Sequence, residues 1–380
     1  MPVETIKLTA TFKVDGQIPE SLFSTYNEIL NNLIDYASMK NITSFKRLRM
    51  ERYHELRMKY QNIPSHYIYT ACQMACSIYK SFRKLKRRGL VRAEKPVFKK
   101  QTIMLDGHLF NLDLENWEAT IATENGRVKL KLLHGTYHEK FKQMKPGQAW
   151  LLNKDDGFYL KVVFSRTFGI VEPDEKAMAV DINENNVVFG SEEYISIVRT
   201  GERVIRTAYF LKRRRLQSRL RLNEKPLLAK YRDRERRRIE DIYHKVANEM
   251  IVVAKKTGTS VVVLEDLRNI RRKKRSRALN GRLNRWSFRR FQSIVEYKAK
   301  LAGMNVVYVD ARGTSSLCPA CGEKLSPNGH RLMRCQKCGL EGDRDAIAVL
   351  NLLQRYKMDM GASPVHSESP PMKRGGKTQC

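Results

Sequence analysis

Two close pairs of cysteines near the C-terminal end place the strongest constraint on how this chain can fold. The pairs read CPAC and CQKC, and a glycine follows each pair. Four thiolates at this spacing form a closed tetrahedral site, and a glycine lets the backbone turn beneath the metal. We therefore predict one structural zinc ion with no open position for catalysis. Its ligands are Cys318, Cys321, Cys335 and Cys338.

The charge of the chain indicates a polyanionic partner. Its 380 residues include 72 Lys and Arg against 40 Asp and Glu, a formal net charge of +32. Nucleic acid is the leading source of countercharge, ahead of an anionic membrane surface. No apolar run approaches the roughly 20 residues that span a bilayer, and the first residues lack the apolar core of a signal peptide. We expect an intracellular protein without membrane association.

The N-terminal half combines strand-like and helical patterns. Residues 5–14 alternate apolar and polar side chains as a strand does, whereas residues 19–91 follow helical spacing. From 96 to 166 strand-like runs return, separated by glycine-containing turns. We predict a β-barrel domain, residues 1–18 and 92–172, whose first strand is separated from the others by a helical insert, residues 19–91.

Strands alternate with helices in the C-terminal half. The strand patterns are AMAVDI, NNVVFG, TSVVVLEDL and MNVVYVDA, of which the last two are typical of buried strands. The helical patterns are a long charged region, NRWSFRRFQSIVEYKAKLAG and DAIAVLNLLQRYK. This alternation predicts an α/β layer fold, in which functional groups lie at the carboxyl ends of the strands. The polar residues 358–380 are expected to be disordered.

Three acidic residues interrupt apolar runs in this half. Asp181 directly follows AMAV, Glu265 directly follows VVVL, and Asp345 begins an apolar helix. Taken singly, each has an ordinary role: Asp181 as a turn residue, Glu265 in an ion pair with a nearby arginine, and Asp345 as a helix N-cap. However, a carboxylate at the end of a buried strand is costly without a compensating charge, and carboxylate oxygens suit Mg²⁺. Together the three predict a catalytic site for two Mg²⁺ ions and phosphodiester hydrolysis.

Three segments together resemble a known family. AMAVDINENNVVFG, VVVLEDL and GTSSLCPACG…RCQKCGLEGDRDAIAVLNLL, in this order, are similar to the RuvC-like nuclease of the TnpB family. Members are transposon-encoded, RNA-guided endonucleases related to compact type V CRISPR effectors. The resemblance implies a multidomain α+β protein with an RNase H-like (RuvC) α/β domain, residues 173–313 and 343–357. A zinc ribbon, residues 314–342, interrupts that domain, and the N-terminal barrel and helices correspond to the family's wedge and recognition parts.

The acidic motifs of the family fall on the same three carboxylates. The resemblance implies that Asp181 and Glu265 are the first two catalytic metal ligands. Asp345 is favoured as the third because its offset to Asn351 matches the family, and Asp343 is its competitor. The departures from the family's third motif are Ile347 in place of Asn and Val349 in place of Ala.

The resemblance also implies partners and a cytoplasmic location in a prokaryote, on the nucleoid when the protein is bound to DNA. The protein would bind a guide RNA, recognise a short motif beside a target in double-stranded DNA, and select the target by base pairing. Two dense basic blocks, residues 80–100 and 268–300, fit contacts with phosphates. The segment RNIRRKKRSR begins three residues after Glu265, and we expect it to act as a mobile lid over the site.

Other functions remain open from the sequence. A nuclease-inactive relative would be an RNA-guided DNA-binding repressor, a transposase would join strands after cutting them, and an unguided nuclease would act on branched DNA. The retained carboxylates favour an enzyme over the repressor. The ribbon between the second and third carboxylates argues, by resemblance, against a transposase.

Overall fold

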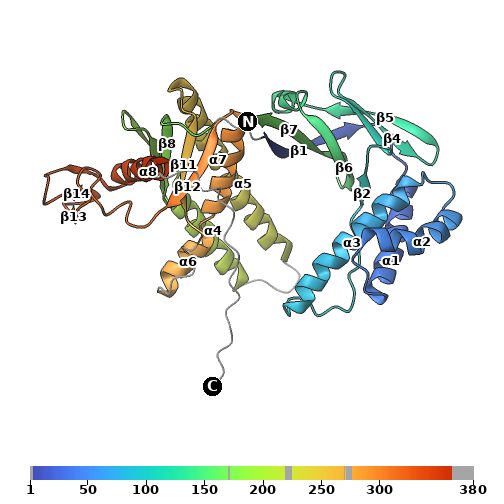
Figure 1. Ribbon diagram of the computed structural model, residues 1–380. Helices are drawn as coiled ribbons and strands as arrows, with labels where there is room; N and C mark the ends of the chain where they lie inside the picture. The colour runs from blue at the N-terminus through green and yellow to red at the C-terminus, as the bar shows by residue number, and fades with distance from the viewer. Residues whose placement is uncertain (1–2, 170–171, 219–224, 269, 271–275, 362–380) are drawn as a thin grey trace. The chain divides into compact units, whose positions relative to one another are not determined.

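The computed structural model describes residues 3–169, 172–218, 225–268, 270 and 276–361 (Figure 1). These residues belong to two compact units. The N-terminal unit comprises Thr5–Thr167, and the C-terminal unit comprises Phe168–Cys380 with Met1–Glu4. Each unit has hydrophobic clusters of its own. None of the described helices combines the length and apolarity needed to span a membrane.

The N-terminal unit is built on a strongly curved sheet. Among its described residues the strand order is β2-β6-β7-β1-β5-β4-β3, so the first strand in sequence lies at the centre. The predicted barrel is found in part, because the sheet is nearly closed while β2 and β3 remain its edge strands. The strands are β1 (Val3–Asp15), β2 (Thr102–Leu105), β3 (Phe110–Asp113), β4 (Glu118–Thr123), β5 (Gly126–Leu133), β6 (Lys145–Lys154) and β7 (Gly157–Gly169).

Helices fill the connection between β1 and β2. In α3, Tyr67, Ala71 and Ala75 recur at helical spacing and are fully buried. They share one core with strand residues such as Phe12 and Leu151. The same buried surface therefore stabilises the helices and the sheet, at about 1.5–3 kcal/mol for each fully buried large apolar side chain. The helices are α1 (Glu20–Met39), α2 (Phe45–Lys59), α3 (His66–Arg87) and, between β5 and β6, the short 3₁₀ helix η1 (Thr136–Phe141).

The C-terminal unit contains a mixed sheet with the order β10-β9-β8-β11-β12 among its described residues. Strands β8, β9 and β10 pair antiparallel, as the predicted strand pair AMAVDI and NNVVFG requires. Strand β11 runs parallel to both β8 and β12. The strands are β8 (Ala177–Ile182), β9 (Asn186–Gly190), β10 (Ile195–Arg199), β11 (Val261–Asp266) and β12 (Asn305–Asp310).

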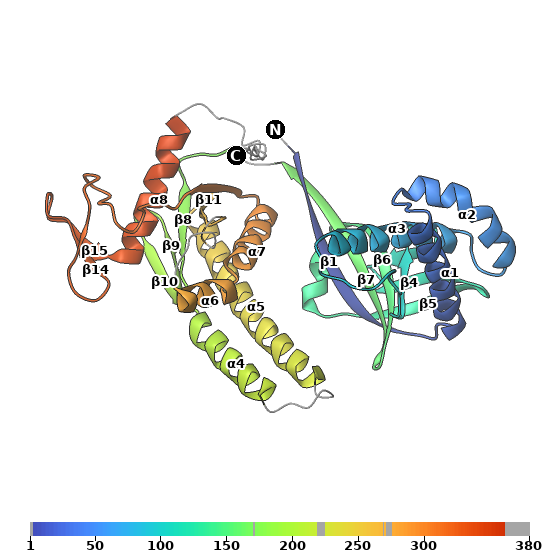
Figure 2. The ribbon, with the colours of Figure 1, turned by 90° about the horizontal axis from the view of Figure 1, so that it is seen from below.

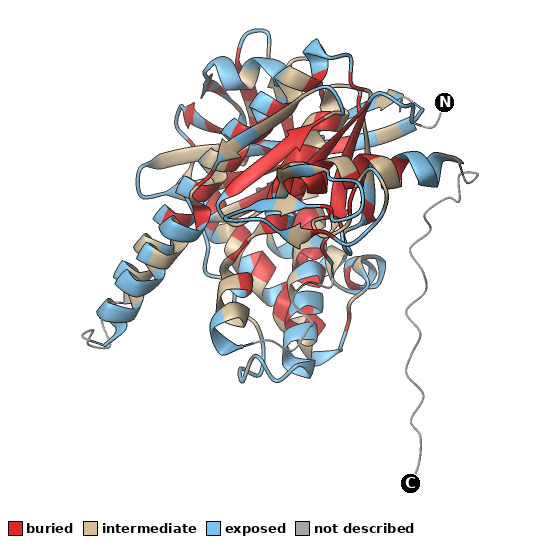
Figure 3. Ribbon diagram, turned by 90° about the vertical axis from the view of Figure 1, so that its left-hand side faces the viewer, coloured by how far each residue is buried: buried red, intermediate tan, exposed pale blue. Residues whose placement is uncertain are grey.

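Helices cover both faces of this sheet, which explains the continuous apolar runs of β8 and β11. Even-numbered residues such as Met178 and Val180 pack with α5 and α7, whereas odd-numbered ones such as Ala179 and Val263 pack with α8. Figure 2 shows α8 and α7 on opposite sides of the strands, and Figure 3 shows the buried strands inside the unit. The helices are α4 (Glu202–Gln217), α5 (Lys225–Lys256), α6 (Arg277–Arg285), α7 (Phe288–Leu301) and α8 (Arg344–Gly361).

The cysteine-rich segment lies between β12 and α8. Its described residues form a small antiparallel sheet with the order β13-β14-β15. We call residues 314–342 the ribbon. The strands are β13 (Ser326–Pro327), β14 (Leu332–Arg334) and β15 (Glu341–Asp343).

Several local expectations differ from the structure. The helix expected from 284 to 303 is divided, because extended backbone at Trp286 separates α6 from α7. Strand β12, expected to be buried, is an edge strand, and Tyr308 on it is 43% exposed. Helix α8 continues to Gly361, past the expected start of disorder at 358. Residues 362–380 and most of the expected lid RNIRRKKRSR lie outside the described residues.

Candidate acidic active site

Strand alternation places two of the expected carboxylates on one face of the sheet. Asp181 in β8 and Glu265 in β11 are odd-numbered, like the strand residues that pack against α8. Strands β8 and β11 are parallel, and Leu264 pairs with Val180. Glu265 therefore follows directly beside Asp181. Two buried strands thus bring neighbouring carboxylates to the face that α8 covers, and Asp181 lies within β8 instead of in a turn.

The third carboxylate lies in the first turn of α8. This helix begins at Arg344, and the residue before it provides the cap. Asp343 Oδ1 accepts hydrogen bonds from the backbone N–H of Asp345, at 2.8 Å, and of Ala346, at 3.3 Å. The N-cap role considered for Asp345 therefore belongs to Asp343. The Asp345 carboxylate instead accepts a 2.9 Å hydrogen bond from Asn186 Nδ2.

All three carboxylates are buried, with 6–7% of each residue exposed. Burial raises the pKa of Asp181 to about 6, against the opposing hydrogen bond from Asn183. Burial and the neighbouring Asp181 charge raise the pKa of Glu265 well above its usual range. Hydrogen bonds from the Ile182 backbone N–H and the Thr314 hydroxyl oppose this rise in the pKa of Glu265. An arginine, the partner considered for Glu265 in an ordinary ion pair, lowers its pKa less than these two hydrogen bonds do. A bound cation would compensate the two adjacent charges.

The three carboxylates line one cleft of about 790 Å³. Arg344 and Arg312 also line it, so the cleft carries both signs of charge. Helix α6 and the residue that follows also line it, with the apolar Leu279, Leu283 and Trp286 beside the charged Arg282. This volume lies in the range of sites that enclose small organic ligands.

Two asparagines hold the carboxylates, and sequence reasoning missed both. Asn183 Nδ2 donates a 2.6 Å hydrogen bond to Asp181, and Asn186 Nδ2 donates to Asp345. Both lie at the turn between β8 and β9. Their nearness to Asp181 in the sequence was the one signal available. The turn therefore orients carboxylates from two different elements.

An arginine from the ribbon reaches the third carboxylate. Arg331 forms an ion pair with Asp345, and its Nε lies 3.5 Å from an Asp343 carboxylate oxygen. The Arg331 carbonyl also accepts a 2.8 Å hydrogen bond from the Arg344 backbone N–H, which fixes its loop at the start of α8. No sequence pattern indicated this contact. The positive charge of this guanidinium opposes the binding of a metal ion at Asp345.

The carboxylate set fits Mg²⁺ by the chemistry of its donors. Its oxygens are hard ligands from separate chain segments, and amides hold two of the three side chains. Within the described residues, however, the four cysteines are the one group of three or more acidic, His or Cys ligands whose atoms all lie within 4.8 Å of one another. The carboxylates line the cleft at wider spacing.

The four expected zinc ligands come together in the ribbon. Their sulfur atoms all lie within 4.8 Å, with 3.5 Å between Cys318 and Cys338 and between Cys321 and Cys335. A hydrogen bond from the Cys338 backbone N–H lowers the pKa of Cys335 to about 6, which favours the thiolate. Four sulfur donors at this spacing can hold a zinc ion and leave no coordination position open.

Helix α8 joins the ribbon to the sheet. Ile347 packs with Leu325 and with two of the cysteines in the core of the ribbon. Asn351 Nδ2 donates hydrogen bonds of 2.7 and 2.8 Å to the carbonyls of Thr314 and Leu317 at the ribbon's start. Ile347 is one of the departures from the family's third motif, and its apolar side chain belongs to this packing.

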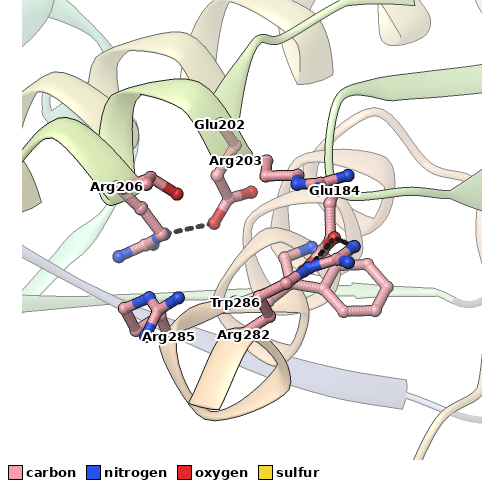
Figure 4. A pocket seen from close by; sticks show the side chains of 8 residues that line it. Glu184, Glu202, Arg203, Arg206, Arg282, Arg285 and Trp286 are labelled. Atoms are coloured by element: carbon pink, nitrogen blue, oxygen red, sulfur yellow. Dashed lines mark hydrogen bonds and ion pairs between the residues drawn. The ribbon is translucent and has the colours of Figure 1, made fainter. Parts of the chain in front are cut away.

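Partly buried ion pairs lie around the turn after β8 (Figure 4). Glu184 in this turn pairs with Arg282 of α6. Glu202 at the start of α4 accepts hydrogen bonds from Arg206 and from the hydroxyl of Tyr243 in α5. The network ties the turn that carries the two asparagines to three helices. No sequence pattern had singled out these pairs.

Comparison of sequences relates the chain to proteins of archaea and bacteria. TnpB-like protein MJ0751 of Methanocaldococcus jannaschii is 36% identical over 260 residues, which cover 62% of this chain and 88% of that protein. TnpB-like protein MJ1635 of the same organism is 24% identical over 92% of this chain and 83% of its own length. The CRISPR-associated endodeoxyribonuclease Cas12f1 of Sulfoacidibacillus thermotolerans is 32% identical over 112 residues, 29% of this chain and 25% of that protein.

Family and structure comparisons agree with these relatives. Residues 288–352, from α7 through the ribbon into α8, match the family described as Cas12f1-like, TNB domain. Residues 22–122 match the uncharacterized protein MJ0013 family. The structure of the mini-RNA-guided endonuclease CRISPR-Cas_phi3 has a TM-score of 0.53 at 11% identity, covers 92% of both chains and so shares the fold. Because the match to MJ0751 covers most of that protein at 36% identity, the chain belongs to the TnpB family.

Proposed function

We propose that this protein is an RNA-guided DNA endonuclease that hydrolyses target DNA with Mg²⁺ at Asp181, Glu265 and Asp345. The observation that carries the proposal is the convergence of three buried carboxylates on one cleft from β8, β11 and α8. The names of two similar proteins, an endodeoxyribonuclease and an RNA-guided endonuclease, support this class of activity. Guide RNA and double-stranded target DNA, recognised beside a short motif, are the proposed partners.

The sheet of the C-terminal unit supports an RNase H-like (RuvC) nuclease domain. Antiparallel β10, β9 and β8 are extended by parallel β11 and β12, with helices on both faces. We assign this domain to residues 173–313 and 343–357, and the zinc ribbon to residues 314–342. In the N-terminal unit we assign the wedge to residues 1–18 and 92–172 and the recognition part to residues 19–91.

The proposed chemistry follows from the positions of the side chains. Hydrolysis with bound Mg²⁺ combines an activated water with a stabilised leaving oxygen. Asp181 and Glu265 would hold the metal at two adjacent strand ends, and Asp345 would complete the ligand set from α8. Arg344 lines the same cleft and offers its guanidinium to a phosphate. Zinc at the four cysteines would have a structural role, because four thiolates leave no position for a reacting group.

The RNA that copurifies with the protein tests guidance. We expect one discrete RNA, and we expect the complex to cut DNA that matches a segment of this RNA and to leave a scrambled target intact. Bulk cellular RNA together with cutting of branched DNA would instead indicate an unguided nuclease. Binding of the matched target without cutting would indicate a guided repressor, and products with newly joined strands would indicate a transposase.

A further inference from the structure

We propose that the apolar wall of the acidic cleft binds the base of the nucleotide next to the cleaved phosphate. Leu279, Leu283 and Trp286 form this wall, which we call the α6 shelf. The proposal rests on the nuclease function proposed above and adds a substrate contact to it. Leu283 and Trp286 also belong to the hydrophobic core of the C-terminal unit, and Leu279 packs against that core.

The shelf is one face of a short helical segment. Leu279 and Leu283 are four residues apart in α6, so their side chains lie on one side of the helix, and Trp286 directly follows the helix end at Arg285. All three line the same cleft as the carboxylates. Leu283 and Trp286 are buried, whereas Leu279 is partly exposed. The shelf therefore has a packed floor and an accessible edge.

Polar contacts fix the shelf relative to the carboxylates. Arg282 lies between the two leucines in sequence and pairs with Glu184 in the turn after β8, as Figure 4 shows. Arg206 of α4 donates a hydrogen bond to Ser287, the neighbour of Trp286. The same turn holds the asparagines that contact Asp181 and Asp345. One turn therefore contacts both the shelf and the carboxylates.

The chemistry of the two walls identifies the occupant. A phosphodiester and its metal ligands account for the acidic wall, but they gain nothing from leucine and tryptophan side chains. The nucleotide beside that phosphodiester carries a base with flat, largely apolar faces, and bases pack on aromatic side chains with little regard to sequence. A base inside a duplex is covered on both faces by its neighbours, so the shelf requires a base that has left the stack.

Single abasic residues in the target strand test the shelf. The complex of the protein with its copurifying RNA is given matched DNA with one abasic residue at successive positions around the mapped cut, in Mg²⁺. We expect cutting to slow about tenfold when the abasic residue adjoins the cut and to stay near the normal rate when it lies farther away. The Leu279→Ala variant should slow the cutting of intact DNA by a similar factor. On DNA whose abasic residue adjoins the cut, the variant should cause little further slowing, because both changes remove the same contact.

Matched variants control this measurement. Leu279→Met keeps an apolar side chain of similar size and should retain most of the rate. Leu211 on α4 is 54% exposed, so Leu211→Ala removes a leucine from a solvent-facing position and should leave both rates unchanged. Equal cutting rates at every abasic position would contradict base binding at the shelf. A further tenfold loss of rate, when Leu279→Ala is combined with the abasic residue next to the cut, would contradict it as well.

Photocrosslinking separates the shelf from the nuclease proposal. 5-Iodouracil is placed at successive positions along the matched target DNA, so that no cut position has to be known. The complex is irradiated with Ca²⁺ in place of Mg²⁺, and crosslinked peptides are identified by mass spectrometry. A crosslink to the peptide that contains Trp286 supports base binding at the shelf. If the same protein never cuts DNA in Mg²⁺, the nuclease proposal is wrong while base binding at the shelf still holds. Cutting without this crosslink at any position, and without an effect of abasic residues, removes the shelf and leaves the nuclease proposal intact.

Discussion

Asp343 and Asp345 are two positions apart and have different roles. Asp343 caps α8 with its side chain, whereas the Asp345 carboxylate reaches the cleft. The sequence predicted the chemistry of Asp181 and Glu265 from the apolar runs before them. It left two choices for the third carboxylate, because capping depends on local hydrogen bonds that a pattern of residue types does not contain. The contact from Arg331 was missed for the same reason, since a turn in the ribbon brings it to α8.

Substitutions at these two aspartates should separate capping from chemistry. We expect Asp343→Ala to lower the free energy of unfolding by about 1 kcal/mol because the N-cap is lost, and Asp343→Ser to retain most of it. Asp345→Asn should abolish cleavage while the protein stays folded. Urea unfolding and DNA cleavage on the same preparations measure both effects. Cleavage that survives Asp345→Asn and disappears in Asp343→Ser would reverse the assignment.

The stability of the metal-free protein should depend on pH through Asp181. Its pKa is about 6 in the folded chain and 3.8 in the ordinary case, so the folded state binds the proton more tightly. Stability therefore falls as pH rises from about 4 to about 6. In EDTA at pH 7 we expect Asp181→Asn to be more stable than wild type by roughly 1–3 kcal/mol, with a smaller difference at pH 4.5. Urea unfolding at both pH values checks this, and parallel changes in the two proteins would contradict it.

Removal of the Arg331 guanidinium should strengthen metal binding. Arg331 pairs with Asp345, so its positive charge repels a metal ion at this carboxylate. We expect Arg331→Gln to bind Mn²⁺ about three- to tenfold more tightly than wild type, measured by calorimetry without DNA. Arg334→Gln is the control, because Arg334 pairs with Glu341 on the ribbon, and its affinity should not change. Weaker Mn²⁺ binding by Arg331→Gln would show that the guanidinium does not compete with the metal.

At the scale of elements, α8 has three roles. It covers one face of the sheet, carries Asp345, and joins the ribbon through Ile347 and Asn351. Helix α8 and strands β8 and β11 could be predicted, because burial leaves a clear periodicity in their sequences. Strand β10 and helix α6 were missed and β12 was taken as fully buried, because partial exposure and short length weaken that periodicity.

Loss of zinc should disrupt the ribbon and spare the sheet. The cysteines form a hydrophobic cluster with Leu325 and Ile347 that is separate from the clusters around the sheet. We expect Cys335→Ser to lose the zinc ion and at least tenfold in cleavage rate, because the loop that ends at α8 loosens, while circular dichroism shows most of the helix retained. Cys76→Ala, in α3, should keep its zinc. A full zinc content in Cys335→Ser, measured by mass spectrometry, would contradict the ligand set.

At the scale of the whole molecule, the two compact units and the net charge of +32 are consistent with a protein that holds RNA and DNA together. The sequence predicted a β-barrel with inserted helices, of which a nearly closed sheet is found, and an α/β half interrupted by a ribbon. It could not show that the inserted helices share one core with the sheet, because side chains far apart in the chain supply that core. The central claim for the whole protein remains metal-dependent cleavage at Asp181, Glu265 and Asp345.

Cleavage of matched DNA by the RNA-bound protein, with and without Asp181→Ala, tests this claim most directly. We expect wild type to cut in Mg²⁺ and to stop in EDTA. Asp181→Ala should cut at least a thousandfold more slowly, because removing an essential group of a catalytic set costs orders of magnitude in rate, while it still binds the RNA and the target. Cutting by Asp181→Ala at the wild-type rate would contradict the proposed active site.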